Sequence, residues 1–176
     1  MKIRGSLSTL LVSLLFGMGL MTAPVLTASP SSAQPLFMSR AAYGTSIIIK
    51  TKQRRLHLRS GNGTVRVYTI AVGRAGKQWY GQTRIVSKLS RPSWSPPPEV
   101  KRDHPELPEL IKGGARNNPM GAGAMVLAGG KYAIHGTNRP SSIGTFASYG
   151  CFRMHNRDVV DLMRRVSVGT PVTVVP

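Results

Sequence analysis

Short runs of β-branched residues separated by glycine turns constrain this chain more than any other feature. Residues 46–51 (SIIIKT) contain three consecutive isoleucines, whose branching at Cβ favours an extended backbone. Residues 54–59 (RRLHLR) alternate, so that the two leucines face one side and the basic residues the other. The turn sequence SGNG at 60–63 suits positive φ, and VRVYTIAVG at 65–73 returns as the second strand of a hairpin. The pattern therefore predicts a mainly β fold.

Further strands are predicted downstream, together with one helix. The strands cover 83–89, 123–129, 131–137 and a final VTVV at 172–175. Residues 157–166 (RDVVDLMRRV) form the clearest helix, because apolar residues recur there at helical spacing. Asn156 is expected to cap this helix, with Asp158 in its first turn, where the helix dipole favours negative charge. A loop rich in Gly, Ser and Pro is expected over 138–150.

The segment 91–114 interrupts this regular pattern. It contains six prolines between Pro92 and Pro108, and proline disrupts the hydrogen-bond ladders of helix and sheet alike. We expect a loop or an extended arm. A loop of this length inside a compact domain is usually functional or disordered. Two interpretations therefore remain open, a lid or flap beside a site and a disordered insertion.

The first 33 residues have the pattern of an export signal. A basic start with Lys2 and Arg4 precedes an apolar run at 7–21, and Ser-Ser-Ala at 31–33 fits a small-x-small cleavage motif. Cleavage after Ala28 is a competing choice. An uncleaved anchor helix is the alternative, although the run is short for a bilayer span.

Both interpretations of this leader place the rest of the chain outside the cytoplasm, in the periplasm or cell wall. Residues 34–45 are then a short tether, and 46–176 form the folded domain. No other segment has the length and hydrophobicity of a membrane span. Membrane contact is therefore expected only through the leader, if it stays uncleaved.

The charge balance predicts the kind of partner. The chain has 24 Lys and Arg against six Asp and Glu, a net charge of +18, and removal of residues 1–33 lowers this by only two. Such a surface attracts polyanions. Outside the cytoplasm we expect anionic wall polymers, lipid head groups or carboxylate-rich peptides rather than nucleic acid. A solvated basic surface without a specific partner is the alternative.

The single cysteine, Cys151, has no partner for an internal disulfide. A free cysteine is often buried and inert, so a reactive role needs support from its neighbours. His135 ends a predicted strand at the entry to the glycine-rich loop, and the chain reaches Cys151 sixteen residues later. If the loop folds back, thiol and imidazole come within hydrogen-bond reach, as acyl transfer through a thiol requires.

Gly150 and Arg153 flank the cysteine and favour the reactive interpretation. Glycine at 150 permits a tight turn, in which successive NH groups can point at a developing oxyanion. Arg153 adds a positive charge that favours a thiolate and can pair with a substrate carboxylate. A structural salt bridge from Arg153 to Asp158 or Asp161 is the alternative.

The other histidines offer no comparable arrangement. His57 lies on the polar face of a strand, His104 lies in the proline-rich segment without a clear partner, and His155 precedes the predicted helix. One cysteine and four scattered histidines contain no close-spaced ligand pair, so no metal site is expected. The GxSxG motif of serine hydrolases is absent, and Ser148 lacks the context of a nucleophile elbow.

The residues around His135 and Cys151 resemble the signature of the YkuD-type L,D-transpeptidases, bacterial enzymes that remodel peptidoglycan. The family has a histidine-glycine pair, a loop, and then Ser-His-Gly-Cys followed by an apolar residue and Arg or Asn. The matching stretches here are HGT at 135–137, SSIG at 141–144 and SYGCFRM at 148–154. WSPP at 94–97 and NPMG at 118–121 also match recurring family segments, and the likeness extends over residues 46–175.

The resemblance implies a β-sandwich or distorted barrel with one packed α-helix, and it implies a chemistry. Cys151 would be the nucleophile, His135 its base, and the carbonyl of Gly136 would orient the imidazole. The thiol would attack an L-centre next to a D-centre in a peptidoglycan stem peptide, and the terminal D-residue would leave. An amine would then resolve the thioester. Water as the acceptor would give an L,D-carboxypeptidase, and neither a metal nor an organic cofactor is implied.

One position departs from the family pattern, since Tyr149 stands where the family usually has histidine. The resemblance places Ser148, Tyr149, Gly150 and Arg153 at the substrate and oxyanion site. Backbone NH groups at 149–151 would survive the exchange, and a tyrosine can donate one hydrogen bond. A changed substrate preference or rate is therefore expected rather than loss of activity. The alternative from another functional class is a non-catalytic, basic module that binds the cell wall and whose thiol is unreactive.

Overall fold

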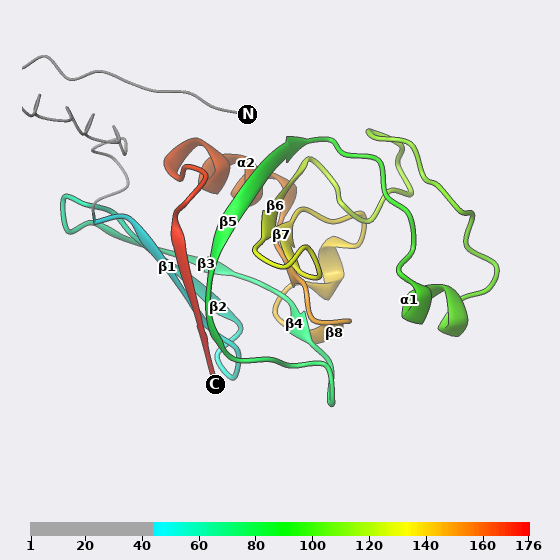
Figure 1. Ribbon diagram of the computed structural model, residues 1–176, viewed down its shortest axis with the longest axis horizontal. Coiled ribbons are helices and arrows are strands. Elements are labelled where there is room, and N and C mark those ends of the chain that lie inside the picture. The colour runs from blue at the N-terminus through cyan, green and yellow to red at the C-terminus, as the bar shows by residue number, and fades with distance from the viewer. Residues whose placement is uncertain (1–43) are drawn as a thin grey trace, which may run out of the picture. The chain divides into compact units, whose positions relative to one another are not determined.

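An eight-stranded curled sheet forms the body of the structure, a computed structural model that describes residues 44–176 (Figure 1). The strand order is β3-β2-β1-β10-β5-β6-β7-β9, and a separate two-stranded sheet pairs β4 with β8. The strands are β1 (Ser46–Lys50), β2 (Arg55–Arg59), β3 (Val65–Thr69), β4 (Val72–Gly73), β5 (Gly81–Ser90), β6 (Gly123–Leu127), β7 (Ala133–His135), β8 (Phe146–Ser148), β9 (Phe152–Arg153) and β10 (Pro171–Val175). The expected leader and most of the tether lie outside the described residues.

The predicted hairpin is present, because β2 pairs antiparallel with β3. The two leucines of β2 are fully buried while the intervening basic residues are not, as the alternation predicted. The strand expected over 65–73 is interrupted, however. It leaves the large sheet after Thr69 and pairs again, as β4, with a different partner.

The strand β5 connects the two halves of the sheet. Its first residues pair with β10 and its last residues pair with β6, and the register shifts by a bulge between Ile85 and Ser87. A bulge bends a strand and increases its twist, and β5 is visibly curved in Figure 1. The sheet thus curls instead of lying flat, in agreement with the expected mainly β class.

The main helix, α2 (Asn156–Arg165), packs against β6 and β7 and closes the core. Its buried residues Val159 and Leu162 join the isoleucines, leucines and valines of the sheet, as the helical periodicity predicted. No helix within residues 44–176 is long and apolar enough to cross a membrane.

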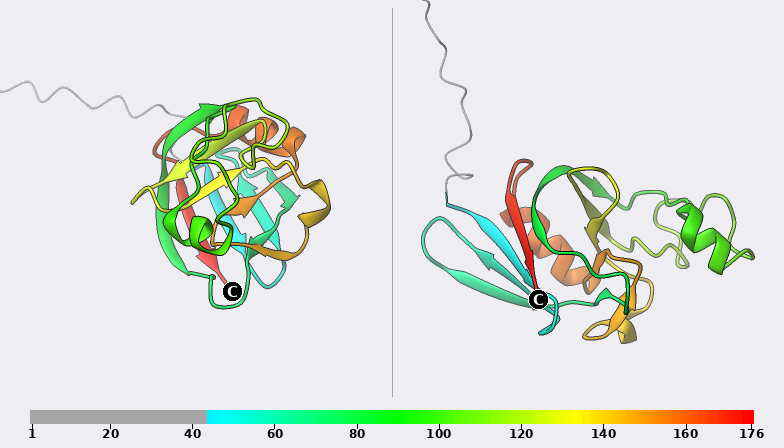
Figure 2. Two further views of the ribbon diagram at one scale, coloured as in Figure 1. Left: turned by 90° about the vertical axis from the view of Figure 1, so that its right-hand side faces the viewer. Right: turned by 60° about the horizontal axis from the view of Figure 1, so that its bottom comes forward.

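Two segments that were expected to be irregular contain regular structure. The loop 138–150 includes the short 3-10 helix η1 (Pro140–Ser142) as well as β8. The proline-rich segment 91–114, hereafter the arm, contains α1 (Pro98–Asp103). Proline is compatible with this helix because it occupies the first turn, where its missing NH costs no hydrogen bond. The right-hand view in Figure 2 shows the arm projecting beyond the sheet.

Candidate active site

His135 ends β7 and Cys151 directly precedes β9, the neighbouring parallel strand, so the loop between them has folded back as predicted. Ile134 of β7 pairs with Phe152 of β9, and the NH of Met154 donates to the carbonyl of His135 at 2.8 Å. Ile134 and Phe152 are buried in the core. Side chains alternate across a strand, so His135 and Cys151 face the opposite side, where both line one cavity.

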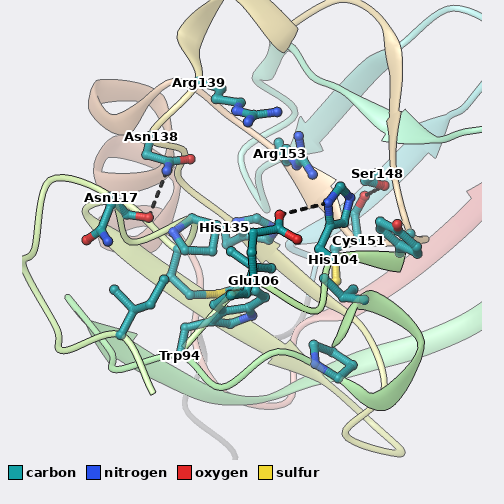
Figure 3. A pocket seen from close by; sticks show the side chains of 17 residues that line it. Trp94, His104, Glu106, Asn117, His135, Asn138, Arg139, Ser148, Cys151 and Arg153 are labelled. Atoms are coloured by element: carbon teal, nitrogen blue, oxygen red, sulfur yellow. Dashed lines mark hydrogen bonds and ion pairs between the residues drawn. The ribbon is translucent and has the colours of Figure 1, made fainter. Parts of the chain in front are cut away.

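This cavity has a volume of about 230 Å³ and lies between the arm and the loop that carries the cysteine (Figure 3). Apolar side chains of the arm form one wall, and the polar and basic side chains of the loop form the other. The lining residues include Trp94, Val100, His104, Glu106, Leu107, Ile111, Met120, His135, Asn138, Arg139, Ser148, Tyr149, Cys151 and Arg153. An apolar cavity with a few convergent polar groups is the usual form of a ligand site.

Backbone hydrogen bonds to the segment 70–74 hold the loop in its folded-back position. The NH of Gly144 donates to the carbonyl of Ile70 at 3.2 Å, and the NH of Arg74 donates to that of Ser148 at 2.9 Å. Ala71 and Arg153 exchange two further bonds of 2.9 and 3.0 Å. The interruption between β3 and β4 therefore positions the cysteine, because it redirects these backbone groups toward the loop.

The turn at 148–151 is shaped by the hydroxyl of Ser148. This buried hydroxyl donates to the carbonyl of Cys151 at 2.5 Å and accepts from the NH of Gly150 at 3.1 Å. Gly150 has a φ of +115°, and an added Cβ would come within 2.5 Å of the Tyr132 ring. Glycine is thus required at position 150, as expected, for two reasons: its positive φ and the lack of space beside Tyr132. Ser148 is engaged within the turn, although the resemblance placed it at the substrate.

Two aromatic residues that were not predicted as part of the site, Trp79 and Tyr132, pack against this turn. Trp79 stacks on Tyr132 with a ring separation of 4.8 Å, and its indole NH donates to the carbonyl of Gly150 at 3.0 Å. Trp79 also contacts the ring of Phe152. A rigid aromatic layer therefore fixes the backbone on both sides of the cysteine.

The imidazole of His135 is neutral at pH 7. Burial, and next the positive charge of Arg153, lower its pKa to about 4, while the carbonyls of Gly136 and Pro119 act in the opposite direction. Its Nδ1 is buried and has no partner with hydrogen-bond geometry among residues 44–176. The Gly136 carbonyl thus influences the ring, as the resemblance implied, without forming a well-aligned bond to Nδ1.

The thiol of Cys151 is protonated in the same state. Burial raises its pKa above the ordinary value, and a backbone hydrogen bond with Ala133 and the charge of Arg153 oppose this effect only in part. Arg153 therefore lowers the pKa of the thiol, as expected, but this effect is smaller than the increase caused by burial. Burial thus favours the neutral form of both groups.

Arg153 lies in the cavity and is not used in a structural salt bridge. Asp158 pairs with Arg157, and Asp161 pairs with Arg165 at 2.7 Å. Among the described residues Arg153 has no carboxylate partner within ion-pair distance. The alternative of a salt bridge to either aspartate is wrong, and the guanidinium is free to meet a ligand.

Asn156 does not cap the helix, contrary to the prediction. His155 occupies the cap position and makes no side-chain capping bond. The Asn156 side chain instead accepts from the NH groups of Ala122 and Thr137, both at 3.0 Å, and donates to the carbonyl of Thr137 at 3.0 Å. It thereby fixes the backbone directly after His135. An added Cβ on Gly136 would lie 2.3 Å from its Oδ1, which explains the glycine after the histidine.

Tyr149 connects the loop of the cysteine to the arm. Its hydroxyl donates to Oδ2 of Asp103 at 2.9 Å, and the guanidinium of Arg74 lies 4.0 Å from its ring centroid and 2.9 Å from the same carboxylate oxygen. These hydrogen bonds lower the pKa of Asp103 to about 2. We call Arg74, Asp103 and Tyr149 the latch. The residue that departs from the family pattern thus holds the helical tip of the arm, which lies beside the cavity as expected of a flap.

Comparison with solved structures identifies the class of fold. An L,D-transpeptidase from Mycobacterium smegmatis superposes with a TM-score of 0.60 at 16% identity, over 76% of this chain and 59% of that one. The catalytic domain of an E. faecium L,D-transpeptidase, solved acylated by ertapenem, gives a TM-score of 0.57 at 16% identity, over 75% and 97%. The fold is therefore that of an L,D-transpeptidase catalytic domain.

Sequence comparison then shows the family. Residues 44–174 match the family model of the L,D-transpeptidase catalytic domain, YkuD. In Escherichia coli (strain K12), "Probable L,D-transpeptidase ErfK/SrfK" is 35% identical over 138 residues, 73% of this chain and 43% of that protein. "Probable L,D-transpeptidase YbiS" of the same strain is 33% identical over 147 residues, 79% and 47%. The chain belongs to the L,D-transpeptidase family, and it spans about half the length of these relatives.

Proposed function

We propose that this protein is an exported L,D-transpeptidase that acts on peptidoglycan stem peptides through a cysteine thioester. The observation that carries the proposal is the cavity, which is lined by both the single thiol and a buried neutral imidazole. Family membership supports the reaction class, and the neutral pair supports general-base activation of the thiol on substrate binding.

The first half-reaction forms the thioester. His135 takes the thiol proton as the sulfur of Cys151 attacks the carbonyl of the L-centre at the third residue of the stem. The imidazolium then gives this proton to the leaving amine, and the terminal D-residue, typically D-alanine, departs. Arg153, which faces the cavity without a carboxylate partner among residues 44–176, pairs with a substrate carboxylate.

The oxyanion is bound by backbone NH groups of the turn. The NH of Gly150 already donates to Ser148 within that turn. The NH groups of Tyr149 and Cys151 have no acceptor in the part of the chain that the structure describes. We therefore assign the oxyanion to these two donors, with Gly150 and Ser148 shaping the turn that presents them.

The second half-reaction transfers the acyl group to an amine. The amine attacks the thioester, His135 accepts its proton, and the thiol of Cys151 is released. Water in place of the amine would make the protein an L,D-carboxypeptidase. The apolar arm over the cavity favours the amine, because it restricts the access of water to the thioester.

The direct test of this function compares the wild type with Cys151→Ala on stem tetrapeptides. The wild type should release D-alanine and carry an acyl group of the mass of the remaining tripeptide. The alanine variant should do neither. Release of D-alanine by Cys151→Ala would show that the thioester mechanism is wrong, and mass analysis of the products distinguishes transfer from hydrolysis.

We also propose that the outer face of β1 and β2 binds anionic wall polymers. Lys50 and Arg55 lie directly opposite each other across these strands, and Arg59 shares the face. Like charges in this position repel. Burial, and next the charges of Lys50 and Arg55, lower the pKa of His57, which lies between the two arginines on β2. The first 98 residues of the chain contain no acidic residue that could relieve this field.

A pull-down with purified sacculi tests this surface. Replacement of Lys50, Arg55 and Arg59 by glutamine should weaken binding and reduce its salt dependence. D-alanine release from a soluble stem peptide serves as the control, because this face lies away from the cavity. Unchanged sacculus binding by the triple variant would contradict the proposal.

A further inference from the structure

The arm is fixed at both its base and its tip. At the base, Trp94 and Ile111 exchange two backbone hydrogen bonds of 2.9 and 2.8 Å. The buried Asn118 amide donates to the carbonyls of Pro92 and Lys112 at 2.9 and 3.0 Å. At the tip, the latch is reinforced by an ion pair between Lys77 and Glu99. The side chains that the arm directs into the cavity are therefore held in place.

Glu106 is the only carboxylate that lines the cavity, and it lies on this arm. The opposite wall carries the guanidinium groups of Arg139 and Arg153, as Figure 3 shows. The cavity thus has an acidic and a basic side. A ligand that fits both sides carries a positive and a negative group.

Glu106 also differs from every other acidic residue of the chain. All six lie within residues 44–176, and each of the other five pairs with a lysine or an arginine. Glu106 has only His104, whose Nδ1 lies 3.3 Å from its Oε1. The Glu106 side chain lines the cavity and is 70% exposed, so its carboxylate, without a lysine or arginine partner, is accessible to a cationic group from solution.

We propose that Glu106, oriented by His104, binds the amino group of the amine acceptor. This inference rests on the proposed function, in which a primary amine resolves the thioester. A primary amine in water is mostly an ammonium ion, and a carboxylate attracts this ion. The ammonium ion gives one proton to solvent before the neutral amine attacks the thioester, and His135 accepts the second proton. The site would thereby favour transfer over hydrolysis, because the negative charge of a carboxylate attracts an ammonium ion more strongly than it attracts a neutral water molecule.

The chain offers a matched control for this site. Glu109 lies on the same arm and is also an exposed glutamate, but it pairs with Lys101 and does not line the cavity. Glu106→Gln and Glu109→Gln each remove one negative charge at nearly constant size. Glu106→Asp retains the carboxylate and tests whether charge at this position restores transfer.

The experiment incubates each variant with a stem tetrapeptide as donor and a second stem peptide with a free diaminopimelate amine as acceptor. Below saturation by the acceptor, Glu106→Gln should lower the ratio of transfer to hydrolysis by up to about fivefold, the effect of losing an ion pair to a largely exposed carboxylate. Glu109→Gln should retain the wild-type ratio, and Glu106→Asp should recover part of it. Thermal unfolding of each variant shows whether the fold persists.

The outcomes separate this inference from the function on which it rests. If the wild type forms no acyl-enzyme, the proposed function fails and the acceptor site fails with it. If the acyl-enzyme forms but Glu106→Gln and Glu109→Gln give equal ratios, only the acceptor site is refuted. An acyl-enzyme that is hydrolysed but never transferred to the amine would refute the acceptor site as well.

Discussion

Acidification from pH 7 to pH 4 is expected to destabilise the folded domain by about 3 kcal/mol through His135 alone. Its pKa is about 4 in the folded state and 6.5 in the unfolded chain, and each unit of difference corresponds to about 1.36 kcal/mol. The unfolded chain therefore takes up the proton first as the pH falls. The stability due to the neutral ring is complete above pH 6.5, declines through the interval between 6.5 and 4, and is constant below it.

Urea unfolding at a series of pH values measures this effect. The reference is His135→Gln, which retains a polar side chain but has no titrating ring. His57 and the carboxylates titrate in both proteins, so their contribution cancels in the difference between the two curves. The free energy of unfolding of the wild type should fall relative to the variant by about 3 kcal/mol between pH 7 and 4.

Parallel curves for the two proteins would refute the reasoning. They would mean that neither burial nor the charge of Arg153 lowers the pKa of this histidine. The same pKa has a kinetic consequence, because only the neutral ring can take the thiol proton. The acid limb of kcat/KM for D-alanine release should lie closer to pH 4 than to pH 6.5.

Two further predictions concern contacts around the site. Tyr149→Phe removes the hydrogen bond to Asp103 but retains the ring beneath the guanidinium of Arg74. Hydrogen exchange of the α1 amides should accelerate, and an unchanged rate would mean that the latch does not hold the arm. Asn156→Ala leaves two NH groups and a carbonyl without partners and should cost about 3 kcal/mol in urea unfolding. A loss well below about 1 kcal/mol would show that water replaces the amide.

Local patterns predicted the parts of the fold that depend on neighbouring residues. The alternation in β2, the glycine turn after it and the apolar spacing of α2 each follow from a few consecutive side chains. The arm helix also had local signals, because a proline begins it, an acidic residue follows in its first turn and basic residues lie in its last. The surrounding prolines obscured these signals.

The parts that were missed depend on residues far apart in the chain. Asn156 has the residue type and position of a helix cap, yet it binds backbone groups next to Gly121 and Gly136. The break after β3 arises because Ala71 bonds to the backbone of Arg153, which no local pattern records. The convergence of His135 and Cys151 on one cavity was predictable because glycines and a strand end mark the returning loop. The role of Tyr149 was not, because its partners lie on two other segments.

The position of β10 sets the order in which this domain can assemble. This strand, built from some of the last residues of the chain, lies between β1 and β5, parallel to one and antiparallel to the other. Until it is available, the two halves of the sheet present unpaired edges, which are templates for aggregation. Contacts between such distant segments also slow folding. A growing chain can therefore join the two halves only after β10 has been synthesised, and deletion of β10 would open the sheet at its centre instead of shortening its margin.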